Sequence, residues 1–299
     1  MGTLREIRQR IGGIKNIQKI TKAMKMVASA KLRRAQESIL ATRPYAKKMG
    51  ALLSHLVSKL DPSMHPLFAP REVRSVALVV VTSDRGLCGA FNTNILRSAV
   101  QEYERLKAEI SDSGGVVRVV TIGKKGSDFF AKRGYTVADK YPGIFSNLHW
   151  GVARTIMDKL TASYSAGTVD RVVVMYNEFK SVIQQRIVTE QLLPVPPEQL
   201  QEAEAESARA QVEYIYEPSG ETIVSALVPR HLSYQMWRVL LESNAAEQAA
   251  RRTAMDNATS NASELIGDLT LSYNKARQAS ITKELLEIVS GAEALTKAE

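Results

Sequence analysis

The fold is decided first by MGTLREIRQRIGGIKNIQKITKAMKMVASAKLRRAQESILATR, residues 1–43. This stretch contains no proline. Its apolar residues recur in steps of three and four, which is the spacing of one face of an α-helix. A stripe this narrow is typical of the seam of a coiled coil. The predicted stripe comprises Leu4, Ile7, Ile11, Ile14, Ile17, Ile20, Met24 and Val27.

The N-terminal helix needs a partner. Gly12 and Gly13 each cost an isolated helix roughly 1 kcal/mol relative to alanine, so a packed helix must hold that turn in place. After Pro44 the apolar pattern resumes, and it stops at Asp61-Pro62. We therefore predict a coiled-coil helix over residues 1–60.

The other end of the chain has the same character. From His231 to Glu299 there is no proline, and only Gly267 and Gly291 interrupt the helical pattern. Small residues at a helix contact allow two backbones to approach closely. Because neither polar helix would be stable alone in water, we predict that the two ends pair antiparallel. The predicted seam comprises Ala245, Ala249, Ala258, Ala262, Leu265, Leu269, Ala276 and Ala279.

Between the two ends, β-branched apolar runs alternate with helical stretches, which indicates βαβ units on a mostly parallel sheet. The predicted fold class is α+α/β: a long antiparallel two-helix coiled coil with a small Rossmann-like α/β domain between its helices. The predicted domains are 1–60, a globular α/β domain over 61–220, and the C-terminal coiled-coil helix over 221–299. The predicted strands are 75–82, 116–122, 171–176, 184–192 and 212–216, and the predicted helices are 92–110, 127–133 and 147–163.

Composition points to an acidic partner. The net charge is +9, and residues 1–48 alone hold thirteen Lys and Arg against two Glu. Nucleic acid, anionic lipid and an acidic protein surface all fit such an excess. The basic residues lie on several helical faces, and Tyr45 is the only aromatic residue among them, which counts against stacking on bases. No run of about 18 apolar residues could cross a bilayer.

The motif SDRGLCGA, residues 83–90, follows the first strand and precedes a helix. Its glycines could cradle a phosphate, but it matches neither GxGxxG nor GxxxxGK[ST], so a tight strand-to-helix turn is the better interpretation. Cys88 is the only cysteine, which excludes an internal disulfide and fits a reducing compartment. It has no neighbouring histidine to make it a nucleophile, and the four histidines have no metal-ligand spacing. We predict no catalytic residue, cofactor or metal.

The C-terminal tail carries a second apolar surface. Its apolar residues fill an arc of about 160° on a helix. We predict that this tip extends beyond its partner helix and needs a hydrophobic socket in another subunit. The residues of this apolar tip are Ile281, Leu285, Leu286, Ile288 and Val289.

Three blocks carry a resemblance: IQKITKAMKMVA (17–28), SDRGLCG (83–89) and NKARQASIT (274–282). With them, the whole chain resembles the gamma subunits of F-type ATP synthases, the central rotor shaft. The resemblance implies one copy per complex, inside a ring of three alpha and three beta subunits. It also implies a foot that sits with the epsilon subunit on the membrane-embedded c-ring, so that membrane association is indirect and nucleic acid is not a partner. Such a subunit has no active site, transmits torque between the c-ring and the catalytic hexamer, and regulates ATPase activity and proton flow.

The resemblance also implies roles for particular residues. Met24 and Lys25 would lie near an acidic loop of the beta subunits, with Arg251 close to that level on the other helix. Arg277 and Gln278 would form a polar catch for a beta-subunit loop, and residues 281–292 would sit in the upper bearing. Arg85 would contact the base of the hexamer or stabilise its own turn.

Two features suggest a source. Residues 194–210 form a short segment without cysteine, which excludes the thiol control of chloroplast members of this family. A bacterial or a mitochondrial type fits, and of the two the direct start at Met1 favours a bacterial one, peripheral on the cytoplasmic face of the inner membrane. Two rival functions stay open: a basic coiled-coil protein that binds nucleic acid, and a nucleotide-dependent enzyme that uses residues 85–89.

Overall fold

The computed structural model describes residues 3–59, 66–69, 71–112, 114–196, 217 and 219–296. The chain forms two compact units. Unit 1 comprises Met1–Val27 and Arg252–Glu299, and unit 2 comprises Ala28–Arg251. The elements are α1 (Leu4–Lys59), β1 (Ser75–Val81), α2 (Phe91–Glu109), β2 (Val116–Ile122), α3 (Lys124–Lys132), β3 (Val137–Tyr141), η2 (Ile144–Ser146), α4 (Trp150–Ser165), β4 (Arg171–Phe179), β5 (Gln185–Leu193) and α6 (Gly220–Thr296).

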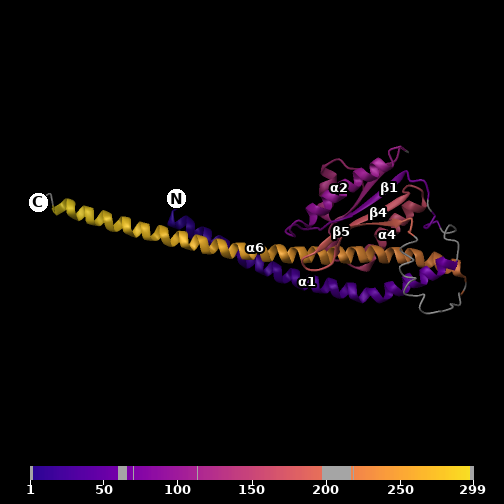
Figure 1. Cartoon of the computed structure of the whole chain (residues 1–299), viewed down its shortest axis with the longest axis horizontal. Helices are drawn as coiled ribbons and strands as arrows, with labels where there is room; N and C mark the ends of the chain where they lie inside the picture. The colour runs from indigo at the N-terminus through magenta and orange to yellow at the C-terminus, as the bar shows by residue number, and fades with distance from the viewer. Residues whose placement is uncertain are drawn as a thin grey trace. The chain divides into compact units, whose positions relative to one another are not determined.

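Unit 2 is built on a five-stranded sheet of order β3-β2-β1-β4-β5. Figure 1 labels β1, β4 and β5 of this sheet. β1 pairs parallel with β2 and β4, and β2 pairs parallel with β3. Among the described strands, only β5 runs antiparallel, against β4. The predicted fold class, with its mostly parallel sheet, is confirmed.

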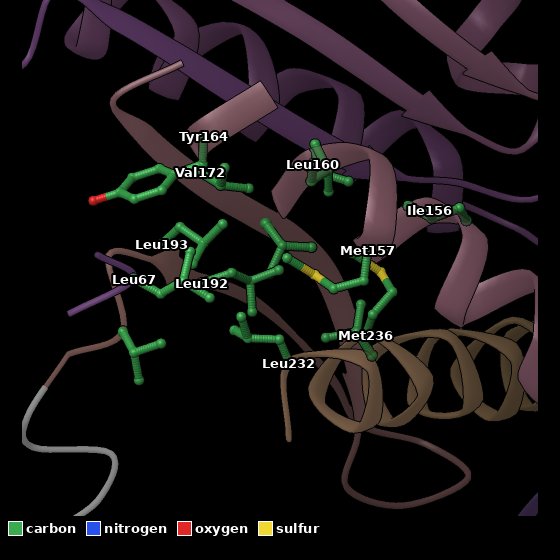
Figure 2. Packing of buried hydrophobic residues seen from close by; sticks show 14 of the residues in the cluster. Leu67, Ile156, Met157, Leu160, Tyr164, Val172, Leu192, Leu193, Leu232 and Met236 are labelled. Carbon is green, nitrogen blue, oxygen red and sulfur yellow. The ribbon is translucent and has the colours of Figure 1, made fainter. Parts of the chain in front are cut away.

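The central strands are continuous apolar runs because helices cover both faces of the sheet. On one face, residues of α2 and α3 pack on alternate residues of β1, such as Val76 and Leu78. On the other face, α4 and parts of α1 and α6 pack on the intervening residues, such as Ala77 and Val79. Figure 2 shows Met157 of α4 lying toward Met236 of α6 within this second core.

The two long helices lie close to their predicted bounds, whereas one strand of the sheet was not predicted. α6 begins at Gly220 and continues through Pro229. α1 also continues through Pro44. β3 was not predicted, because VADKY is short and only alternate residues of it are partly buried. The predicted strand 212–216 lies outside the described residues.

In unit 1, α1 and α6 run antiparallel. Their polar contacts pair Gln18 with Ser263, Thr21 with Thr259, and Lys25 with Asp256, so residue numbers rise on one helix as they fall on the other. The antiparallel pairing predicted for the two ends is therefore present here.

The predicted seam of α1 was wrong at three of its positions beyond Ile14, whereas Met24 is half-buried. Ile17, Ile20 and Val27 are each more than half exposed, and Gln18 and Thr21 take their places at the contact. Two successive steps of three, from 14 to 17 to 20, rotate a stripe off the contact by about 120°. Alternating steps of four and three keep it in place. Polar residues therefore sit in the seam, and apolar residues lie outside it.

The predicted seam of α6 needs a similar correction. Leu265 and Ala279 are exposed, whereas Ile266 and Ser280 are partly buried. Ala245 and Ala249, in the part of α6 that belongs to unit 2, are fully buried as predicted.

Candidate functional site

The turn at residues 83–90 follows β1 at the point where the strand order reverses. In open α/β sheets, ligands bind in the crevice beyond the carboxyl ends of the strands at this point. Here α6 occupies the place of such a ligand. Its Ala246 is buried together with Cys88 of the turn and Phe91 of α2, and Phe179 packs beside them. A turn that packs on a helix in this way supports the interpretation as a tight turn over that of a phosphate cradle.

The turn is held from the sheet side by a carboxylate. Asp84 accepts hydrogen bonds from the backbone N–H groups of Lys124 at 2.9 Å, Gly143 at 2.6 Å and Phe145 at 3.1 Å. Ser83 donates its hydroxyl hydrogen to the carbonyl of Arg85 at 2.7 Å. Asp84 thus ties the β1 turn to the starts of α3 and η2.

The turn is held from the α6 side by a guanidinium. Arg251 donates to the carbonyls of Arg85 at 3.3 Å and Gly86 at 3.2 Å. Glu247, one helical turn earlier, forms an ion pair with Arg251 at 2.5 Å. Burial raises the pKa of the Glu247 carboxyl, and the nearby Arg251 charge opposes that rise. Arg251 therefore joins α6 to the turn through two backbone oxygens.

Cys88 is a buried structural thiol. Burial raises its pKa, while Ser83 and Arg251 oppose the rise. Asn92 donates a hydrogen bond to its sulfur at 3.2 Å. A thiol held protonated and covered is a poor nucleophile. This environment gives no support to an enzymatic role for Cys88.

Two further residues of α6, Arg238 and Glu242, join the helix to β4 and β5 through polar contacts. Arg238 donates to Tyr176 at 2.8 Å and forms an ion pair with Glu190 at 2.5 Å. Burial acts to lower the pKa of Arg238, but the interactions with Tyr176 and Glu190 outweigh it and raise that pKa. Glu242 accepts a hydrogen bond from the backbone N–H of Phe179 at 3.1 Å. The sheet therefore holds this part of α6 along β4, β5 and the β1 turn.

The structure places the predicted site residues in three groups. Arg251 lies at the β1 turn in unit 2, with its guanidinium on the carbonyl of Arg85. The guanidinium of Arg85 itself is exposed and makes no ion pair or hydrogen bond with another described residue. In unit 1, Met24 is half-buried, and Lys25 forms an ion pair with Asp256 at 2.5 Å across the seam. Asp256 was not predicted as a site residue. An isolated acidic residue on a polar helix face indicates an ion pair only when the register of α1 against α6 is known.

The third group is the end of α6. Arg277 and Gln278 are exposed, and every residue of the apolar tip is at least half exposed. The cross-seam pairs set a register that brings the start of α1, at Leu4, opposite about Arg277. The apolar tip therefore extends beyond the first turn of α1, as the end of α6 does in Figure 1. This agrees with the overhang predicted from the sequence.

Within the part of the chain that the structure describes, no helix is long and apolar enough to cross a membrane. In the same residues, no group of three His, Cys, Asp or Glu side chains is arranged to hold a metal ion. Fold and site together define a structural protein, with an antiparallel helix pair in unit 1, a small α/β domain in unit 2, and exposed apolar side chains near the end of α6.

Comparison with known proteins identifies the family. A family model described as ATP synthase matches residues 3–295. The ATP synthase gamma chain of Chloroherpeton thalassium is 53% identical over 301 residues, which cover 99% of each chain. The chain belongs to the ATP synthase gamma chain family.

Solved structures agree on the fold. The central stalk and c-ring structure of the Tetrahymena thermophila mitochondrial ATP synthase matches with a TM-score of 0.55 and 26% identity. That match covers 80% of this chain and 99% of the other. A chain of the Euglena gracilis mitochondrial ATP synthase matches with a TM-score of 0.66 and 23% identity, over 98% of this chain and 95% of that one.

Proposed function

We propose that this chain is the central-stalk rotor subunit of an F-type, proton-transporting ATP synthase. It transmits torque between the membrane c-ring and the catalytic hexamer of alpha and beta subunits, and it regulates ATP hydrolysis and proton flow. It is a non-catalytic subunit, and the catalytic sites lie on the beta subunits. One copy serves each complex, together with the epsilon subunit.

The observation that carries the proposal is the antiparallel helix pair of unit 1 with its exposed apolar tip, in a chain of the gamma family. A helix pair resists bending and twisting better than a loop or a single helix. An exposed apolar arc at its end gains free energy when a bearing covers it, on the order of 2 kcal/mol for each large side chain that becomes fully buried. Stiffness and an apolar end in a socket are the properties that a rotating shaft needs.

The polar contacts of α6 in unit 2 suit the same role. Torque applied to a foot reaches a shaft only if the two are joined along a length rather than at one point. Arg238, Glu242 and Arg251 join α6 to β5, β4 and the β1 turn at three successive levels. We propose that these contacts keep the foot from slipping around the shaft.

The partner contacts follow the same assignment. Met24 and Lys25 face the acidic loops of the beta subunits, with Asp256 holding the lysine in place between encounters. Arg277 and Gln278 catch a beta-subunit loop, and the apolar tip sits in the upper bearing. The domain division into 1–60, 61–220 and 221–299 assigns the first and last segments to the shaft and the middle one to the foot.

Membrane association is peripheral and runs through the c-ring. The excess positive charge of residues 1–48 suits acidic loops of the beta subunits more than bases, because Tyr45 is the only aromatic residue in that stretch and one ring offers little for stacking. We place the chain on the cytoplasmic face of a bacterial inner membrane.

A reconstitution experiment tests the proposal. Purified chain, alpha and beta subunits are mixed singly, in pairs and all together, and ATP hydrolysis is measured in each mixture. We expect rapid turnover only in the ternary mixture. Equal rates with and without the chain, or hydrolysis by the chain alone, would contradict the rotor assignment. Tight, salt-sensitive DNA binding without hexamer association would favour the nucleic-acid alternative instead.

A further inference from the structure

Leu87 has an unusual backbone. Its φ is +63°, and it is the only residue other than glycine with a positive φ among the described residues. A left-handed backbone is costly for a leucine, whereas glycine adopts it freely. The leucine side chain is also 65% exposed, so burial in this chain does not offset the cost. Strain of this kind persists only where the surroundings impose it, and it concentrates at functional sites.

The surroundings of Leu87 impose its conformation from both sides. Before it, the carbonyls of Arg85 and Gly86 accept hydrogen bonds from Arg251, and the Asp84 carboxylate is held by three backbone N–H groups. After it, Cys88 is buried against α6. The turn is anchored at each end, and the leucine between the anchors is presented to solvent.

The surface around Leu87 is positively charged. Arg85, Lys124 and Lys125 are exposed, and none of them forms an ion pair with another described residue. The side chain of Lys125 reaches the turn, where its Cε lies 3.8 Å from the position that a Cβ would take at Gly86. The carboxylate of Asp84 is engaged by backbone donors. One exposed leucine within a cationic border is the complement of an apolar recess bordered by carboxylates.

We propose that Leu87 is a preformed contact with a stationary protein partner, inserted into an apolar recess with acidic residues at its edge. Arg251 is the positioning residue that sets this contact, because it fixes the carbonyls just before Leu87 to α6. The inference rests on the proposed function, which makes the hexamer of alpha and beta subunits the partner. A single leucine buries too little area to hold a membrane, and an apolar contact is of little use to a nucleic acid.

Substitution of Leu87 separates a contact from a structural role. In Leu87→Asn the new residue tolerates the left-handed backbone, so the unfolding midpoint of the isolated chain should stay the same or rise. The same variant should bind the complex of alpha and beta subunits at least fivefold more weakly, measured by titrating fluorescently labelled chain. The matched control is Ile183→Asn, at an exposed apolar residue without positive φ, and it should bind like wild type.

Arg251→Lys tests the positioning role. Lysine keeps the charge but lacks the planar fork that serves two carbonyls. Binding should weaken several-fold in the wild-type background and hardly further in the Leu87→Asn background, because both changes remove one contact.

The outcomes distinguish this inference from the proposed function. If wild-type chain fails to activate hydrolysis in the ternary mixture, the proposed function fails and this inference fails with it. If wild type activates hydrolysis but Leu87→Asn binds as tightly as wild type, or only as weakly as Ile183→Asn, this inference alone is overturned. Additive losses for Leu87→Asn and Arg251→Lys would overturn the positioning role.

Discussion

The same two helices are stabilised differently in the two units. In unit 2, α6 is buried over most of its circumference: Leu240, Ala245 and Ala246 are fully covered, and polar contacts fix the helix to the sheet. In unit 1, only the residues that face α1 are covered, and polar pairs such as Thr21 with Thr259 occupy the seam. A helix in unit 2 therefore gets its stability from its own domain, while the helices of unit 1 leave apolar surface that other chains can cover.

This contrast predicts two different effects of mutation, one on the stability of the isolated chain and one on the stability of the assembled complex. A change in unit 2 should lower the stability of the isolated chain. A change at the exposed surface of unit 1 should leave the isolated chain nearly unaffected and weaken the assembled complex. The four predictions that follow test this division, from the largest expected effect to the smallest.

Leu240→Ala should lower the free energy of unfolding by about 4 kcal/mol, because it leaves a cavity in the core under the sheet. Leu285→Ala, at the exposed tip, should change the same quantity by less than about 0.5 kcal/mol. Both are measured by chemical denaturation of the isolated chain. Similar losses for the two variants would break the comparison.

His231 should make unit 2 sensitive to acid. Burial, and to a lesser degree the charge of Arg238, lower the pKa of His231 to about 4. As the pH falls from about 6.5 toward 4, the unfolded chain takes up a proton that the folded chain refuses, so stability decreases. The loss is on the order of 3 kcal/mol by linkage.

The test of this pH dependence is unfolding at pH 7, 5.5 and 4.5. His231→Gln should flatten the fall in stability over this range. His149→Gln changes an exposed histidine and should leave the fall as it is in wild type. A His231→Gln chain that loses stability as steeply as wild type would show that other groups govern acid sensitivity.

Removal of residues 281–299 should weaken binding to the hexamer by roughly tenfold to a hundredfold, or about 1.4–2.8 kcal/mol. The apolar tip lies in this segment, and its side chains are at least half exposed in unit 1. The unfolding midpoint of unit 2 should not change. A truncated chain that binds like the full chain, and whose complex melts at the same temperature, would show that no socket covers the tip.

The polar seam should show the smallest effect. Thr21→Val or Thr259→Val alone should cost about 0.5–1 kcal/mol, since each removes one partner of the 2.8 Å hydroxyl pair. Replacement of both should cost less than the sum, because two valines of similar shape can pack on each other. Strict additivity in a double-mutant cycle would mean that the pair makes no direct contribution.

Much of the fold could be predicted from the sequence because it depends on periodicity. Long proline-free patterns at both ends indicated the helix pair, and alternating β-branched and helical runs indicated the sheet. The seam residues were harder to predict. Ile17 and Ile20 looked like seam residues because they are apolar, yet Gln18 and Thr21 keep the alternating spacing and make the contact. Hydrophobicity and helix register predict different seam residues at this point, and the contact follows the register.

Parts of the candidate site have no sequence signal. The link from Arg251 to the carbonyl of Arg85 spans 166 residues and uses a backbone oxygen, which any residue type supplies. The positive φ of Leu87 has no signal in the sequence. From the sequence one would expect the neighbouring glycine, rather than the leucine, to adopt the left-handed conformation. By contrast, the exposed apolar arc of the tip was predictable because its residues recur at the spacing of one helix face.

Direct observation of rotation tests the central claim most directly. Ile183→Cys provides an attachment point, since Ile183 is 89% exposed while the native Cys88 is buried and has a raised pKa. A bead is attached there, and the hexamer of alpha and beta subunits is fixed to a surface. A rotor predicts that the bead turns continuously in one direction when ATP is added and stops when ATP is removed. A bead that only fluctuates about one position while the same complexes hydrolyse ATP would contradict the account.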